Sequence, residues 1–306
     1  MARRAYVPSG KSDPGALPPI AIATLVAGIL TGLALGFVSQ WLSLLIIYPA
    51  ALGAIIGGVG TTQIKSRHVR QPLAVAFIGL VAGLVGETTL HLTKYWTTRS
   101  QIASAIQNDR TADAYVSQNG MPAAVDSVLK GDSAAPFLGY LALAAKNGIT
   151  ITKAGHSSSS SSPTLTGIGV YTLWLINFLI VCGAAIFMLV SEARKPFCEG
   201  CVAWYDSTRP IANGAGDTAT VKQTVLRLES SQYAEAARSL GTSDGKSATT
   251  LTLLGCSKCN AHDPLLELTR MTGLNTKKRQ LKRAFATLIS PSEAAQLRES
   301  VTPKAG

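Results

Sequence analysis

The sequence predicts a mainly α-helical membrane protein with a small α+β domain at its C-terminal end. Two observations predict this fold class. No Asp, Glu, Lys or Arg occurs from position 14 to position 64, and four of the five cysteines form two Cys-x-x-Cys pairs in the C-terminal third. Only 15% of the chain is charged, whereas soluble domains average about 25%. This composition excludes a disordered chain, a collagen-like chain and a simple soluble enzyme.

Four segments are predicted to be transmembrane helices, because a helix needs about 20 mainly apolar residues to cross a membrane. Three lie within residues 18–93, at about 19–38, 42–60 and 71–92, and the fourth occupies residues 167–191. A signal peptide has an apolar run of only about 7 to 15 residues. The first segment is longer and is followed almost at once by the second, so we interpret it as a retained anchor.

Positive residues predict that both termini are cytoplasmic, since Lys and Arg accumulate in short cytoplasmic segments. The N-terminal segment 1–17, the connection between the second and third helices, and the start of segment 192–306 all carry them. The turn between the first two helices carries none. We therefore expect a multi-pass protein of the cell membrane with residues 94–166 on the non-cytoplasmic side. The residues concerned are Arg3, Arg4, Lys11, Lys65, Arg67, Arg70, Arg194 and Lys195.

The non-cytoplasmic segment 94–166 is predicted to be a small helical connector that ends in a flexible tether, Ser157 to Ser162. Its apolar residues support three helices. They are Ile102, Ile106, Ala112 and Tyr115 for the first, Ala123, Val125, Val128 and Leu129 for the second, and the stretch from Phe137 to Ala144 for the third.

Glycines recur at helical spacing in the first three membrane segments. Small residues at this spacing allow helix backbones to approach closely, so we expect them to pack the bundle together. A homo-oligomer or a pore that uses the same surface is the alternative. The residues are Gly28, Gly32 and Gly36, then Gly53 and Gly57, then Gly79, Gly83 and Gly86.

Glu87 and His91 are the ionisable pair within the third segment, and their spacing places them on one helix face. Intramembrane ionisable groups are candidates for function. Because both lie in the outer third of the segment, our preferred interpretation is that they reach interfacial water. Proton or ion handling is the alternative.

The two cysteine pairs, Cys198 with Cys201 and Cys256 with Cys259, predict a zinc site. Zinc prefers four tetrahedral ligands, and two pairs of thiolates complete that shell. The alternating residues 250–253 and 266–269 predict strands on either side of the second pair. A hairpin with cysteines at its tip is typical of a zinc ribbon.

The separation of the two pairs is longer than the roughly 15 to 20 residues of the common pattern. We account for the excess by a helix over about 218–240, with Asp217 as its N-cap and Gly241 just past its end. Segment 192–306 is therefore predicted to be a zinc-ribbon-like domain with a helical insertion and a basic tail.

Two other uses of the cysteine pairs are weighed against zinc. Structural disulfides conflict with a cytoplasmic location. A redox dithiol usually stands at the start of a helix, and neither pair precedes an obvious one. His262 is an alternative ligand to a cysteine, but we expect it to be a solvated hairpin residue. Cys182, in the fourth membrane segment, is expected to be a small buried hydrophobic residue.

The basic tail is predicted to be a solvated helix face that is also able to contact anionic lipid. Nucleic acid is not expected as a partner, because no aromatic stacking platform accompanies the cluster. Ser290 and Glu293 have the spacing of a capping box, which predicts a short final helix. The basic residues are Lys277, Lys278, Arg279, Lys282 and Arg283.

The layout resembles a group of uncharacterised bacterial inner-membrane proteins. These have three Gly-rich spans, a small outer segment, a fourth span and then two Cys-x-x-Cys motifs, here beginning at Pro196-Phe197-Cys198. The resemblance implies an inner-membrane location and a bound metal, and it implies no activity.

The sequence therefore predicts a non-catalytic membrane protein that presents a structural zinc module to a cytoplasmic protein partner. No acid–base pair, nucleophile triad or phosphate-binding loop is recognisable in it. The alternatives are a membrane dithiol-disulfide oxidoreductase that uses one cysteine pair, and a small transporter or channel component.

Overall fold

A computed structural model of the chain describes residue 6 and residues 9–39, 47–108, 113–131, 133–150, 164–240, 247–258, 263–272 and 280–301. The chain divides into two compact units. The helical unit comprises Ser12–Ala193. The sheet unit combines Met1–Lys11 with Arg194–Gly306.

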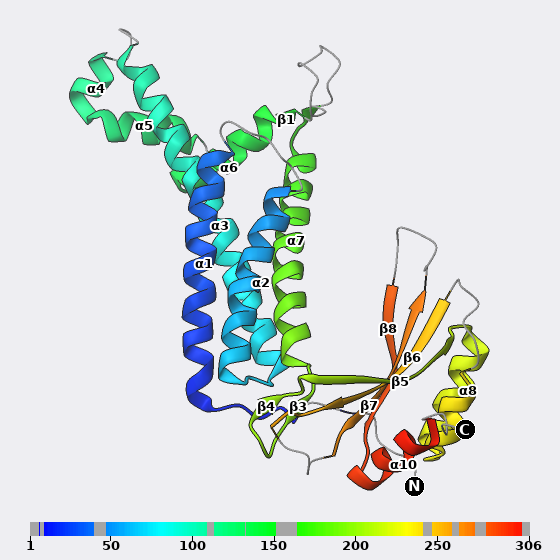
Figure 1. Cartoon of the computed structure of the whole chain (residues 1–306). Coiled ribbons are helices and arrows are strands. Elements are labelled where there is room, and N and C mark those ends of the chain that lie inside the picture. The colour runs from blue at the N-terminus through cyan, green and yellow to red at the C-terminus, as the bar shows by residue number, and fades with distance from the viewer. Residues whose placement is uncertain are drawn as a thin grey trace. The chain divides into compact units, whose positions relative to one another are not determined.

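The helical unit contains four helices that are long and apolar enough to cross a membrane (Figure 1), namely α1 (Leu17–Val38), α2 (Ile47–Arg67), α3 (Pro72–Gln107) and α7 (Ile168–Ala193). A short 3-10 turn, η1 (Pro14–Ala16), precedes α1. The four predicted membrane segments are thus confirmed as long apolar helices. The predicted start of the second segment, at residue 42, lies outside the described residues.

Two of these helices are longer than predicted. α2 continues past residue 60 to Arg67, and α3 continues past residue 92 to Gln107. The physical reason is that neither extension contains a proline or a glycine, so nothing in the sequence stops the helix where the apolar run ends. Ile102 and Ile106 therefore belong to α3, and the separate helix predicted from them together with Tyr115 is wrong.

The remaining outer segment folds as three short helices, α4 (Asp113–Asn119), α5 (Met121–Lys130) and α6 (Pro136–Asn147), of which the second and third match the prediction. They are followed by a short antiparallel pair, β1 (Ile149–Thr150) with β2 (Thr164–Leu165). Tyr95 of α3 packs with Val125, Leu129 and Tyr140 in a small core of their own. The predicted serine tether lies outside the described residues.

The repeated glycines pack helices of the same chain against one another, as predicted. A Cβ added at Gly32 of α1 would lie 2.5 Å from the carbonyl oxygen of Gly86 on α3. A Cβ added at Gly53 of α2 would lie 2.5 Å from the carbonyl oxygen of Val181 on α7. These distances are too short for any side chain, so the close approach of each helix pair requires glycine.

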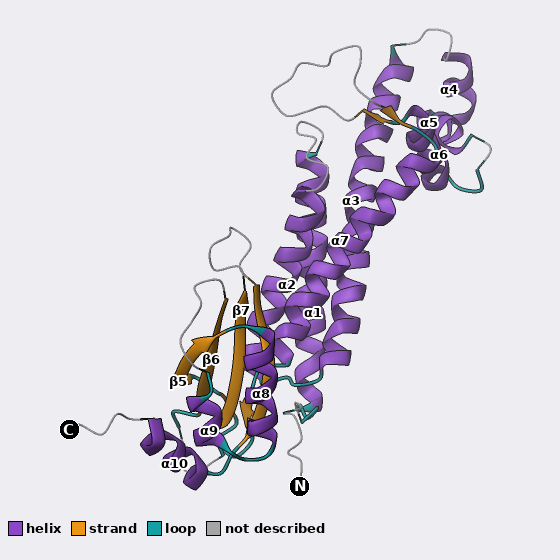
Figure 2. Ribbon diagram, turned by 90° about the vertical axis from the view of Figure 1, so that its right-hand side faces the viewer, coloured by secondary structure: helices purple, strands orange, loops and turns teal. Residues whose placement is uncertain are grey.

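The sheet unit is built on four antiparallel strands in the order β5 (Ser207–Ala215), β6 (Ser247–Gly255), β7 (Leu265–Thr272) and β8 (Gln280–Leu288). Three helices, α8 (Thr218–Glu229), α9 (Tyr233–Arg238) and α10 (Pro291–Val301), contribute to the core of this sheet (Figure 2). A small hairpin of β3 (Phe197–Cys198) and β4 (Ala203–Trp204) precedes them. Buried Leu228, Leu251, Leu268 and Leu297 belong to this one apolar core.

The predicted strands around the second cysteine pair are confirmed as β6 and β7, which pair Leu251 with Leu268 and Leu253 with Leu266. They are part of a wider sheet with a helical layer and its own apolar core. The predicted hairpin is therefore the centre of a four-stranded sheet, and not the zinc-ribbon arrangement that was predicted for segment 192–306.

Two helix predictions in this unit need correction. The helix predicted over 218–240 is interrupted between α8 and α9, where Ser231 adopts a positive φ of 63°. The basic tail is not a helix face, because Lys282 and Arg283 lie on β8. Residues 277–279 lie outside the described residues, as does Gly241.

Both predicted N-terminal helix caps are present. The Asp217 side chain accepts a hydrogen bond from the backbone N–H of Thr220 at 2.9 Å. Hydrogen bonding to the side chain of Thr220, together with this backbone bond, lowers the pKa of the Asp217 carboxyl. At the start of α10, the backbone N–H of Ser290 donates to Glu293 at 2.8 Å, and the backbone N–H of Glu293 donates to the Ser290 hydroxyl at 3.3 Å. This reciprocal pair is the capping box expected from the spacing.

Candidate metal centre

Three of the four predicted ligands come together in the sheet unit. The Sγ atoms of Cys198, Cys201 and Cys256 all lie within 4.8 Å of one another. None of the three cysteines is in a disulfide, and a group at these separations is able to hold a metal ion. Cys259 and His262, the predicted fourth ligand and its alternative, lie outside the described residues.

The first cysteine pair belongs to the β3–β4 hairpin. Cys198 ends β3 and pairs with Ala203, while Phe197 pairs with Trp204 and contacts its ring at a centroid distance of 5.1 Å. The turn between the strands contains Cys201. Pairing of the short strands thus brings Cys198 and the turn that contains Cys201 together.

The second cysteine pair begins where β6 ends. Asp206, which lies between β4 and β5, accepts hydrogen bonds from both the backbone N–H and the hydroxyl of Ser257. Its own backbone N–H donates to the carbonyl oxygen of Gly255 at 3.2 Å. These bonds hold the residues on both sides of Cys256. The bonds from the hydroxyl and the backbone N–H of Ser257 also lower the pKa of the Asp206 carboxyl.

Two tyrosines support the first cysteine pair. The backbone N–H of Phe197 donates to the Tyr6 hydroxyl at 3.3 Å, and the backbone N–H of Tyr6 donates to the carbonyl oxygen of Ala286 on β8 at 2.8 Å. Tyr205 donates its hydroxyl proton to the carbonyl oxygen of Asp263 at 2.8 Å. Burial raises the pKa of the Tyr205 phenol, and the neighbouring charge of Cys198 raises it further.

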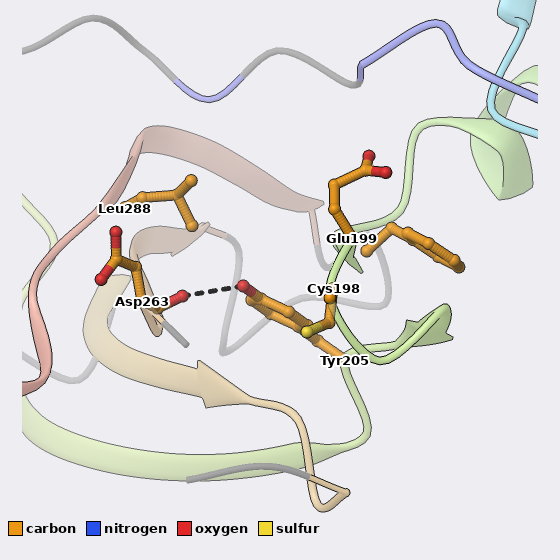
Figure 3. Close-up of a pocket in the computed structure, with 7 residues that line it drawn as sticks. Cys198, Glu199, Tyr205, Asp263 and Leu288 are labelled. Carbon is orange, nitrogen blue, oxygen red and sulfur yellow. Dashed lines mark hydrogen bonds between the residues drawn. The ribbon is translucent and has the colours of Figure 1, made fainter. Parts of the chain in front are cut away.

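A pocket of about 300 Å³ adjoins this centre (Figure 3). Its wall is apolar at Phe197 and Leu288 and carries the carboxylates of Glu199 and Asp263. Cys198 lies beside the Tyr205 ring in this view. Cys198 also lines the pocket, but it is only 2% exposed, so little of this residue is accessible to solvent.

The structure adds four polar residues to the centre that the sequence did not indicate, namely Tyr6, Tyr205, Asp206 and Asp263. Tyr205, Asp206 and Asp263 each lie within five residues of a cysteine pair in the sequence. Tyr6 is 191 residues away from Phe197 in the sequence, and it is still farther from Ala286. No spacing signal connects residues so distant, so a three-dimensional structure is required to find them.

The fifth cysteine, Cys182, belongs to α7 of the helical unit and is 4% exposed. Its thiol is 3.8 Å from the carbonyl oxygen of Leu80, and it packs against Gly83 of α3. These contacts match the prediction of a small buried residue.

The Glu87–His91 pair belongs to α3 of the helical unit. Glu87 is only 8% exposed, so neighbouring helices cover most of its side chain. Its Oε1 atom lies 3.6 Å from His91 Nε2.

Comparisons with protein family models, with curated proteins and with solved structures find no match for this chain.

Proposed function

We propose that the chain is a cell-membrane protein whose sheet unit is stabilised by one structural zinc ion and binds a cytoplasmic protein partner. Cys198, Cys201, Cys256 and Cys259 would hold the ion as thiolates. The observation that carries this proposal is the convergence of three cysteine Sγ atoms within 4.8 Å. Cys259 follows Cys256 at the same spacing that separates Cys201 from Cys198, which makes it the expected fourth ligand.

A structural role for the ion follows from what its ligands connect. Cys198 and Cys201 belong to the β3–β4 hairpin, and Cys256 follows β6. An ion bound to both would join the hairpin to the sheet, and its binding energy would add to the folding energy of the unit. Four thiolates leave no open coordination position for a substrate, which argues against a catalytic metal.

The pocket beside the centre supports the partner part of the proposal. Apolar walls with a few charged groups are typical of sites that receive a side chain or small ligand. Contact with anionic lipid through the basic tail is a weaker component of the proposal. Of its described members, Arg283 is already ion-paired with Glu267, and Lys282 is exposed.

The test is metal analysis of the full-length chain purified in detergent under reducing conditions without added metal. We expect one zinc ion per chain by mass spectrometry, with four thiols protected from a thiol reagent until a chelator is added. Cys198→Ser, Cys201→Ser, Cys256→Ser and Cys259→Ser should each reduce the zinc content sharply, because loss of one ligand opens the tetrahedral shell.

Cys182→Ser is the matched control, since it makes the same chemical change at a cysteine of the helical unit. It should retain a full complement of zinc. A metal-free wild-type protein with readily oxidised thiols would contradict the zinc proposal and favour a dithiol oxidoreductase.

A further inference from the structure

The helical unit contains a buried carboxyl group in which only one of the two oxygen atoms has a polar partner. Glu87 on α3 is 8% exposed, and its Oε1 atom lies 3.6 Å from His91 Nε2. Its other oxygen, Oε2, is buried and has no hydrogen-bond partner in the described part of the chain. A buried carboxylate oxygen without a donor is costly, so this atom indicates that something binds to it.

The position of Glu87 follows from the packing of α3 on α7. Gly83 lies against Cys182, and the His91 ring contacts the Trp174 ring at a centroid distance of 5.1 Å. The two helices are therefore antiparallel along this stretch. Glu87, midway between Gly83 and His91, lies at the level of Asn177, one turn from Trp174.

Asn177 supplies a second buried acceptor at this level. Its Oδ1 atom also has no hydrogen-bond partner among the described residues. Two oxygen acceptors at one level of the bundle have no donor, although burial of polar groups normally requires one. A proton on Glu87 Oε2 resolves the imbalance, because it removes the negative charge and converts one acceptor into a donor.

We propose that Glu87 is a proton-binding site of the helical unit and exchanges its proton through His91. The exchange would take place at the distal end of the bundle, defined as the end where α1 ends and α7 begins. His91 lies one turn from Glu87 toward that end of α3, and its side chain is 16% exposed. Toward the other end, Gly83 packs on Cys182 and Gly79 packs on Leu189. Proton access is therefore from one end, as in a pH-sensing site and not in a conducting path.

Few other ionisable groups face this site. On α3 itself, Lys94 is within electrostatic range of Glu87, and on α7 the same holds for Cys182. The described α1 has no titratable side chain, and the distal half of α2 has only Tyr48. Two oxygen atoms are too few for the coordination shell of a metal cation, which favours a proton as the ligand.

A hydrophobic carbodiimide tests this proposal directly on the full-length chain in detergent micelles. The reagent adds a protonated carboxylic acid across its C=N bond, and acyl transfer to nitrogen leaves a stable N-acylurea. We expect mass spectrometry to find this adduct on Glu87, formed several-fold faster at about pH 6 than at about pH 8, because only the protonated acid reacts.

Glu192 on α7 is the internal control in the same digest. It is buried to a similar extent, at 7% exposed, but Lys65 Nζ lies 3.9 Å from its carboxylate. Lys65 contacts the Glu192 carboxylate, whereas Glu87 Oε2 has no hydrogen-bond partner among the described residues, so Glu192 should react more slowly than Glu87 at either pH. Absence of the adduct on Glu87, or a rate that does not depend on pH once corrected for Glu192, would overturn the proposal. Protection by sodium at constant pH would also overturn it, since the ligand would then be an alkali ion.

Glu87→Gln provides a second readout that does not depend on reagent access. The amide is neutral and carries its own donor, so it mimics the protonated acid. We expect the variant to unfold at a higher temperature than the wild type at about pH 8, with the difference disappearing at about pH 6. A variant that is less stable than the wild type at both pH values would contradict the assignment.

Discussion

Single residues outside the cysteine pairs hold the candidate metal centre in shape. Asp206 binds Ser257 through both carboxylate oxygens, and it thereby fixes the residue that follows Cys256. Groups that orient metal ligands commonly change metal affinity by about 10-fold to 100-fold when they are removed. Asp206 is therefore the residue whose loss should affect the metal without removing a ligand.

Asp206→Ala should release zinc about 10-fold faster than the wild type to a competing chelator, because the second cysteine pair loses its anchor. The measurement is the rate of absorbance change of a chromogenic chelator mixed with the zinc-loaded, full-length protein.

Asp217→Ala is the matched control, since it removes the same charged group from the same unit. Asp217 caps α8 through the backbone N–H of Thr220. This variant should unfold at a lower temperature but release zinc at the wild-type rate. Equal rates for all three proteins would refute the anchoring role of Asp206.

The candidate site was predictable from the sequence to the extent that covalent spacing determines it. Two residues between cysteines place both thiols of a pair on one side of a tight turn, so Cys198 and Cys201 were found directly. Tyr6 was not predictable, because its contact with Phe197 depends on the docking of the N-terminal segment beside β8.

Among the elements, the four long helices are held together by close backbone contacts. α1 packs on α3 through Gly28, Gly32 and Gly36, and α2 packs on α7 through Gly53 and Gly57. Since lipid is as apolar as the helix surfaces, such contacts and not burial from water must stabilise the bundle.

Gly53→Ala should therefore destabilise the bundle by about 1 to 3 kcal/mol, the usual cost of overpacking. The new Cβ would lie 2.5 Å from the carbonyl oxygen of Val181, which belongs to the backbone of α7 and cannot turn away. Thermal unfolding in detergent, followed by circular dichroism, measures the loss.

Gly58→Ala on the same helix is the control for this prediction. A Cβ at Gly58 meets no atom within 4 Å, and alanine is the better helix former. Its unfolding temperature should equal or exceed that of the wild type. If both alanine variants behave alike, the glycine contacts between α2 and α7 do not determine stability.

Elements with a clear pattern of apolar residues were predicted from the sequence, and elements without such a pattern were missed. Apolar runs located the membrane helices, and alternation located β6 and β7. The end of α3 was missed because the apolar run ends near residue 92. Residues 93–107 are more polar, but they contain no proline or glycine that would end the helix. β8 was missed because its first half, at Leu281, Lys282 and Arg283, is exposed and basic, which resembles a solvated helix face.

At the scale of the whole molecule, the N-terminal segment belongs to the same compact unit as the C-terminal region. Tyr6 hydrogen-bonds with Phe197 and with Ala286, so these parts of the chain occupy the same side of any membrane that the helices cross. A chain that crosses a membrane an even number of times has the segments before and after the crossings on the same side. The four long apolar helices would give an even number of crossings. The positive residues predict that this side is the cytoplasm.

The metal centre is the feature on which the proposed function depends. Its most direct test is X-ray absorption spectroscopy at the zinc edge on the purified full-length protein. The account predicts four sulfur neighbours at about 2.3 Å and no nitrogen or oxygen neighbour. Three sulfur neighbours and one nitrogen neighbour would indicate that a histidine such as His262 is the fourth ligand in place of Cys259. Zinc with oxygen neighbours alone, or no zinc, would contradict a thiolate centre built from Cys198, Cys201, Cys256 and Cys259.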